Sequence, residues 1–265
     1  MDVGLRSPLL EFFKRGEVAK DVRLLAARGA LAPRAHEQIA LLAILTEDGD
    51  PDVRGAAEAT LAAIPQESLA AFLGKPEVGG GLKDFFRARG IDPAGGVQTG
   101  DEPLIETESA NPSAETTTGE DAEGEGAERR GATERLALLD VAGRMKAAMK
   151  GSKEERAVLI RDSNKLVSVA VLSSPKLSES EVENFSKMAN VSEEVLRIIG
   201  MNRGWTKNYG VIAGLTKNPK TPLSVSLHLV QRLNDRDLKM IMMDRNLQEP
   251  LKIAVKKRLR SPEKK

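Results

Sequence analysis

The residue types best suited to chemistry stand together in one short stretch, Arg203-Gly204-Trp205-Thr206-Lys207-Asn208-Tyr209. It holds the chain's only tryptophan and only tyrosine, beside two cations. On a helix, their spacing of four would put both rings on one face, and an aromatic surface beside positive charge suits a peptide, a nucleotide base or a cation. The alternative is that Trp205 is buried where helices meet, with its indole N–H bound to a carbonyl. Arg203, Trp205, Lys207 and Tyr209 are therefore predicted either to bind a partner or to form a junction between repeats.

A second group is the densest run of cations, in the sequence LKIAVKKRLR from Leu251 to Arg260. Clustered lysines and arginines attract phosphates or acidic protein surfaces. The alternative is an ordinary solvated helix face. We take Lys252, Lys256 and Lys257 as the partner-binding candidates of this run.

The composition argues against most catalytic and metal chemistry. The chain has no cysteine, which excludes disulfides, thiolate zinc sites and cysteine nucleophiles. His36 and His228 each lack a second histidine at metal-ligand spacing. The acidic stretch Asp48–Asp52 differs from a calcium loop because it contains Pro51 and lacks the downstream glutamate, so we read it as a turn between helices. We expect no catalytic residue, no metal, no cofactor and no enzymatic activity.

The pattern of apolar residues predicts helices. Hydrophobic residues make up 40% of the chain but aromatic residues only 3%, which disfavours sheets. Two pairs, Ser7-Pro8 and Thr221-Pro222, place a hydroxyl before a proline, as at a helix N-cap. Residues recur at helical spacing in several stripes, among them Val53, Ala56, Ala57, Thr60, Leu61 and Ile64, and Leu138, Val141, Ala142, Met145 and Met149. The predicted fold class is all-α.

The distribution of charge divides the chain into parts. Residues 1–90 are nearly neutral, whereas residues 91–132 carry 2 basic and 11 acidic residues among many Gly, Pro, Ser and Thr. Residues 133–265 carry 26 basic and 15 acidic residues. Because segment 91–132 has little apolar surface to bury, we predict a disordered acidic linker between a helical module at 1–90 and a basic helical module at 133–260, followed by a basic tail at 261–265.

An internal repeat links two parts of the basic module. The sequence from Val167 onward resembles the sequence from Gly210 onward, and an offset of 44 residues matches Pro175 to Pro219 and Lys176 to Lys220. A period in the forties is typical of stacked helical pairs, because one pair cannot bury its apolar face alone. The sequence therefore predicts an α-solenoid with two helices in each repeat.

Two stretches resemble known repeat families. DGDPDVRGAAEATL, from Asp48, resembles the second helix of a HEAT-type repeat. LTKNPKTPLSVSLHL, from Leu215, resembles the leucine-rich-repeat variant, whose Asn-Pro-x-Thr-Pro turn matches Asn218 to Pro222. The stretch from Thr133 to Arg260 also resembles an uncharacterised bacterial helical-repeat family. The resemblance implies a curved helical surface for a partner and no reaction; the cysteine-bound cluster of some leucine-rich-repeat variants is excluded in this cysteine-free chain.

These observations favour a non-enzymatic scaffold or adaptor that binds another protein, and an acidic protein is one candidate because the C-terminal module carries excess positive charge. A nucleic-acid-binding helical repeat that uses the basic module is the alternative. The sequence has no apolar stretch of membrane-spanning length and no signal-peptide pattern, so we expect a cytoplasmic protein without a membrane partner. The oligomeric state stays open.

Overall fold

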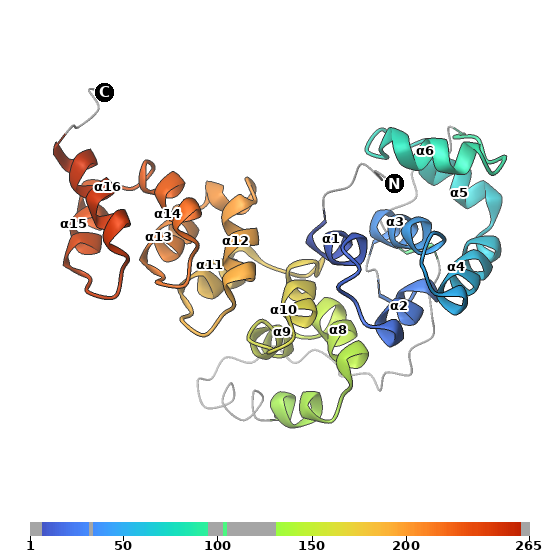
Figure 1. Ribbon diagram of the computed structural model, residues 1–265, viewed down its shortest axis with the longest axis horizontal. Coiled ribbons are helices and arrows are strands. Elements are labelled where there is room, and N and C mark those ends of the chain that lie inside the picture. The colour runs from blue at the N-terminus through green and yellow to red at the C-terminus, as the bar shows by residue number, and fades with distance from the viewer. Residues whose placement is uncertain (1–6, 32–33, 95–102, 105–130, 261–265) are drawn as a thin grey trace. The chain divides into compact units, whose positions relative to one another are not determined.

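The computed structural model describes residues 7–31, 34–94, 103–104 and 131–260, and these residues form helices and no strand. The predicted all-α class is confirmed for them. The chain divides into two compact units (Figure 1). The N-terminal unit comprises Met1–Arg156 with Ser173–Pro175, and the C-terminal unit comprises Ala157–Leu172 with Lys176–Lys265.

Short helices build the N-terminal unit. They are α1 (Pro8–Lys14), α2 (Lys20–Ala27), α3 (Ala35–Leu45), α4 (Pro51–Ala63), α5 (Gln66–Leu73), α6 (Gly80–Arg87) and α8 (Val141–Lys150). Residues 131–137 are also helical, and α9 (Lys153–Leu159) crosses the boundary between the units. The charge distribution of the sequence assigns α8 to the basic module that begins at residue 133. In the structure α8 contacts α2 and belongs to the N-terminal unit.

Helix α3 forms the centre of this unit. All its residues except His36 and Ile44 are buried, and α1, α2, α4 and α6 contact it. Each fully buried Leu or Ile side chain stabilises the fold by about 1.5–3 kcal/mol. The His36 ring meets the Phe72 ring edge-on, with the centroids 5.6 Å apart. Helix α3 is therefore enclosed by other helices, and its buried polar residues Glu37 and Gln38 take part in side-chain hydrogen bonds.

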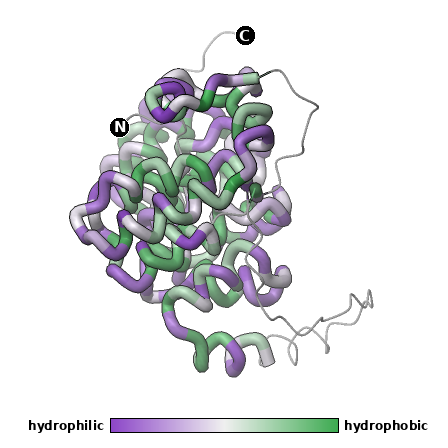
Figure 2. Tube along the Cα trace, turned by 90° about the vertical axis from the view of Figure 1, so that its right-hand side faces the viewer, coloured by the Kyte–Doolittle hydropathy of each residue, from purple (hydrophilic) through white to green (hydrophobic). Residues whose placement is uncertain are grey.

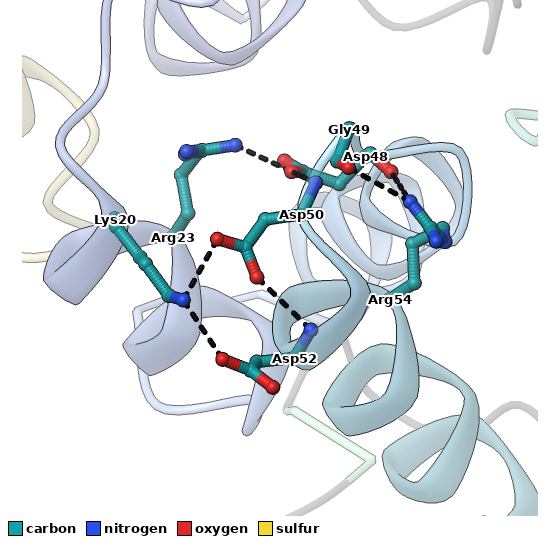
Figure 3. Close-up of polar contacts among 7 residues, drawn as sticks. All are labelled: Lys20, Arg23, Asp48, Gly49, Asp50, Asp52 and Arg54. Atoms are coloured by element: carbon teal, nitrogen blue, oxygen red, sulfur yellow. Dashed lines mark hydrogen bonds and ion pairs between the residues drawn. The ribbon is translucent and has the colours of Figure 1, made fainter.

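The acidic turn between α3 and α4 is held by cations from α2 and α4 (Figure 3). The Asp50 carboxylate accepts from the Asp52 N–H at 3.0 Å and so caps α4, while Lys20 Nζ lies 2.8 Å from both carboxylates. Arg23 pairs with Asp48, and Arg54 donates to the backbone oxygens of Asp48 and Gly49. The hydrogen bond to Asp50 and then that to Asp52 raise the pKa of Lys20. Residues Asp48 to Asp52 thus form the predicted turn between helices, and their carboxylates are paired with cations of the same unit.

Two of the predicted stripes of apolar residues differ, since one forms a buried helix face and the other is interrupted by the start of a helix. Val53, Ala57 and Leu61 are buried along α4, which confirms that helix and its inner face. In the second stripe Met145 and Met149 are buried, but Leu138 is 89% exposed. Asp140 explains the difference, because its side chain accepts from Gly143 N and starts α8 after Leu138.

The predicted disordered linker 91–132 is wrong at three described places. Ala94 N donates to Ala70 O at 3.0 Å, Leu104 N donates to the side chain of Gln38, and Ala132 is buried within a helix. At each of these places a buried apolar side chain or a backbone N–H with an acceptor ties the described residue to the N-terminal unit. The rest of the predicted linker, 95–102 and 105–130, and the predicted tail at 261–265 lie outside the described residues.

The C-terminal unit begins at Ala157, within α9, and also consists of short helices. Its helices are α10 (Lys165–Leu172), α11 (Glu179–Lys187), α12 (Glu193–Met201), the 3₁₀ turn η1 (Trp205–Lys207), α13 (Tyr209–Lys217), α14 (Leu223–Val230), α15 (Asp235–Met243) and α16 (Glu249–Arg260). In the helices nearest the viewer in Figure 2, hydrophobic and hydrophilic residues are interspersed along the chain trace, as expected for helices with one buried face.

Helices of this unit pack on the next helix but one. Helices α10, α12, α14 and α16 form one row of contacts, and α11, α13 and α15 form a second. Loops of five residues join α11 to α12, α13 to α14, and α15 to α16. Successive helices therefore alternate between two rows, so that each helical pair covers the apolar face of the pair before it (Figure 1).

Glycines allow the close approach within each row. A Cβ atom on Gly214 of α13 would lie 2.1 Å from Ser186 Oγ of α11, and one on Gly200 of α12 would lie 2.3 Å from Val225 Cγ1 of α14. Neither distance is compatible with a side chain. These two positions set the spacing of adjacent helices in the two rows.

The 44-residue offset of the sequence repeat spans three helices, since Lys165 begins α10 and Tyr209 begins α13. The expectation of two helices in each 44-residue unit is therefore wrong. Pairs of helices begin at Glu179, Tyr209 and Asp235, so the packing unit is shorter than the sequence repeat. A shift of three helices can align because these helices share apolar residues at helical spacing and each ends at a turn.

Two predicted caps are also wrong. Ser7 precedes α1 but its hydroxyl donates to Glu37 Oε1 at 2.9 Å instead of capping the helix. The N-cap of α14 is Pro222, and the Thr221 hydroxyl is buried without a partner among the described residues. Ser192, by contrast, accepts from Val195 N and caps α12, and Glu193 and Glu194 lie in its first turn, where the helix macrodipole favours negative charge.

Candidate interaction surface

Helix α16 turns its cations toward solvent. Leu251 and Val255 are buried, and α16 contacts α14 and α15. Lys256 and Lys257 are exposed and Lys252 is half-buried. Within the described parts of the chain, none of these three lysines has a hydrogen-bond or ion-pair partner. Their charge is therefore available to a ligand from outside.

Apolar side chains accompany these lysines on the last two helices. Met240 and Met243 of α15 are 51% and 81% exposed, and Ile253 of α16 is 62% exposed. Sequence reasoning missed them, although MIMM at 240–243 and Ile253, which lies outside the buried stripe of Leu251 and Val255, carried the signal. We use the name α15–α16 surface for these exposed side chains of two contacting helices together with the three lysines, namely Met240, Met243, Lys252, Ile253, Lys256 and Lys257; Met240 Sδ also lies 3.9 Å from Lys217 Nζ of α13.

The predicted aromatic platform does not form on one helix. Trp205 lies in the 3₁₀ turn η1, Asn208 caps α13, and Tyr209 is the first residue of α13. The two rings therefore belong to different elements, and within the described residues they make no ring contact with each other. The spacing of four residues misled because a helix boundary falls between them.

Tyr209 is instead part of a polar cluster that joins α13 to α15. Its hydroxyl donates to Asp237 Oδ2 and accepts from Asn234 N at 3.2 Å. Lys217 Nζ lies 2.5 Å from Asp237 Oδ1. The bond from Lys217 and then that from Tyr209 lower the pKa of the Asp237 carboxyl, while burial and the bond to Asp237 raise the pKa of Tyr209. The tyrosine is thus engaged in holding two helices together.

Trp205 lies at a junction between helices. The turn η1 contacts both α12 and α13, and Trp205 is half-buried while Thr206 beside it is buried. Arg203 and Lys207 on either side are exposed. This geometry is that of the junction alternative, although no hydrogen bond from the indole N–H is present among the described residues.

Two cavities open beside the α13–α14 loop. One of about 580 Å³ is lined by residues that include Glu193, Lys220 and Gln248, and one of about 220 Å³ by residues that include Lys187 and Lys217. The first brings one carboxylate and one ammonium together, and both lysines of the second are paired with acids, Lys187 with Glu183 and Lys217 with Asp237. Neither cavity concentrates charge of one sign as the α15–α16 surface does.

Metal-ligating side chains do not converge in the described part of the chain, where no group of three or more His, Asp or Glu could hold a metal ion. Nor is any described helix long and apolar enough to cross a membrane. No family model, curated protein or solved structure was found to match the chain.

Proposed function

We propose that the chain is a non-enzymatic scaffold whose C-terminal unit is a short α-solenoid that binds an acidic segment of another protein. The solenoid proposal is supported by the alternating contacts of α10 to α16, since each row continues from one helical pair to the next. Such stacks present extended surfaces made of successive helices. The HEAT-like and leucine-rich-repeat-variant resemblance agrees with this arrangement and stays a prediction.

One observation carries the choice of partner. On the α15–α16 surface, lysines without partners stand on the same helix as Ile253, and two exposed methionines lie on the adjoining helix. Flexible methionine side chains suit surfaces that accept varied apolar groups. A segment that alternates acidic and apolar residues would neutralise the lysines and cover the apolar side chains together.

Nucleic acid is the second candidate, and the lysines favour it. Phosphates bind clustered cations irrespective of sequence, but they leave Met240, Met243 and Ile253 without a role. Sequence-tolerant single-strand binding usually adds aromatic rings for base stacking. On the α15–α16 surface no aromatic residue is present, so the observations favour the acidic protein segment.

Two synthetic peptides test the proposal, one alternating Glu with Leu and the other alternating Glu with Ser. Both carry equal charge, so they differ only in apolar content. Fluorescence anisotropy should show that the Glu-Leu peptide binds more tightly than the Glu-Ser peptide. Ile253→Asp should lower the affinity for the Glu-Leu peptide by about ten-fold, as for an interface anchor worth more than 1 kcal/mol. Leu139→Asp, at a part-exposed apolar residue of the N-terminal unit, serves as the matched control. Equal affinity of the two peptides would remove the apolar half of the proposal.

A further inference from the structure

The sulfur atoms of the chain all belong to methionines, since the sequence has eight methionines and no cysteine. Burial divides the methionines into groups. Met145 and Met149 of α8 are 0% and 1% exposed, whereas Met201, Met240 and Met243 are 66%, 51% and 81% exposed. A small oxidant in solution therefore reaches the second group and is kept from the first.

The three exposed sulfur atoms differ in their neighbours. Arg197 Nη1 lies 3.5 Å from Met201 Sδ, and Lys217 Nζ lies 3.9 Å from Met240 Sδ. A cation that donates to a thioether engages the lone pair with which the sulfur attacks a peroxide. Met243 Sδ has no such neighbour within the described parts of the chain. Met243 thus combines the largest exposure of the three with an unengaged lone pair.

Oxidation would change the character of this side chain. The sulfur lone pair attacks one oxygen of hydrogen peroxide, the O–O bond breaks, and the departing hydroxide takes the proton of the transferred OH group and becomes water. The sulfur loses two electrons, the peroxide gains them, and a flexible apolar side chain becomes a polar sulfoxide. An apolar group that covered Met243 would then have to strip water from the new oxygen, which is unfavourable.

We propose that Met243 is a site of reversible oxidation by hydrogen peroxide, and that its sulfoxide weakens the α15–α16 surface toward an acidic protein segment with apolar side chains. This inference rests on the function proposed for that surface. Met243 is the last residue of α15, and the three lysines of the surface lie on α16. Because oxidation leaves the charge of these lysines unchanged, it removes only the apolar part of the binding.

Tandem mass spectrometry of the full chain tests the site. During brief treatment with hydrogen peroxide, Met243 should be converted to the sulfoxide before Met201 and Met240, and the buried Met145 and Met149 should be converted last. Conversion of Met201 or Met240 as fast as that of Met243 would overturn the assignment of Met243 as the preferred site.

Fluorescence anisotropy before and after the same treatment tests the effect on binding. The affinity for the Glu-Leu peptide should fall by about five-fold or more, while the affinity for the Glu-Ser peptide should not change. Methionine sulfoxide reductase with a dithiol should restore the first affinity, since it regenerates the thioether. Glu-Leu binding that survives full conversion of Met243 overturns the proposal and leaves the function of the surface standing. Absence of Glu-Leu binding before any peroxide is added contradicts that function, and the effect of oxidation with it.

Met201 supplies a matched control, because Met201 and Met243 each end a helix of nine residues. Met243→Leu removes the sulfur at an exposed position, so the affinity of this variant for the Glu-Leu peptide should be the same before and after peroxide. Met201→Leu should lose affinity on oxidation as the parent does. If oxidised Met243→Leu loses as much affinity as the oxidised parent, other methionines are responsible and the proposal is wrong.

Discussion

The side-chain amide nitrogen of Asn218 lies 2.9 Å from the carbonyl oxygen of Ser186, 32 residues earlier in the chain. The same nitrogen donates to Met188 O, also at 2.9 Å, and Asn218 is 5% exposed. One buried amide therefore satisfies two carbonyls at the end of α11 from the end of α13. It links successive helical pairs in the row where Gly214 sets the spacing.

Asn218→Ala should destabilise the C-terminal unit. It leaves two carbonyl oxygens without their donor, and an unsatisfied buried polar group costs about 1–3 kcal/mol. Asn246→Ala is the control, because Asn246 is exposed and only its backbone N–H bonds Asp244. Urea unfolding followed by circular dichroism gives both values, and equal stability of the two variants would show that the link is unimportant.

The same substitution at two helical glycines should change stability in opposite directions. Gly214→Ala forces a methyl group against Ser186 and should cost about 1–3 kcal/mol. Gly55→Ala in α4 meets no atom within 4 Å and should stabilise by about 0.5–1 kcal/mol through helix propensity. Thermal unfolding of both variants checks this, and a stabilised Gly214→Ala variant would contradict the close packing of α11 and α13.

The stabilising effect of the Tyr209–Asp237–Lys217 cluster should depend on pH. The folded-state pKa of Asp237 is lowered, so its contribution is present above the ordinary value of 3.8 and is lost as pH falls through the lower folded value. The free energies of unfolding of parent and Asp237→Asn should differ by a constant amount at neutral pH and converge in acid. Asp235→Asn, on the same exposed turn, is the control. A difference that stays unchanged below pH 3.8 would show that the Asp237 charge does not contribute.

Trp205→Ala should lower stability while leaving binding of the Glu-Leu peptide unchanged. Truncating a fully buried tryptophan costs about 3–5 kcal/mol, and a half-buried one should cost about 2 kcal/mol. Arg203→Ala and Lys207→Ala, at exposed positions, should change neither quantity. Loss of peptide binding at all three residues, with stability preserved, would instead identify the stretch as a binding site.

The spacing of apolar residues and the positions of prolines predicted those features that neighbouring residues along the chain determine. The buried face of α4 at Val53, Ala57 and Leu61 follows from the helical period of its apolar residues. The turn before α4 follows from Pro51, which is the first residue of the helix. The break before α8 depends on Asp140 alone, a single cap that the apolar stripe hides. Helix boundaries thus account for both the exposed Leu138 and the separated rings of Trp205 and Tyr209.

Contacts between residues far apart in the chain could not be predicted from apolar spacing or from prolines. The pairing of Lys217 with Asp237 joins residues 20 apart, and the bond from Leu104 to Gln38 joins residues 66 apart. Each depends on how helices pack, which composition and period do not specify. The three lysines of α16 were predicted as a group from their density, whereas the exposed Met240, Met243 and Ile253 emerged only from packing.

The salt dependence of binding distinguishes an acidic protein segment from nucleic acid as the ligand of the α15–α16 surface. Affinities of the Glu-Leu peptide and of a DNA duplex are measured from low salt to about 0.15 M, for the parent and for Lys252→Gln, Lys256→Gln and Lys257→Gln combined. Peptide binding should persist near physiological salt through the apolar part of the peptide and weaken in the triple variant, while DNA binding should be lost at that salt. Tight DNA binding at that salt, with a log–log slope that falls by about one unit for each lysine removed, would contradict the choice of an acidic protein segment.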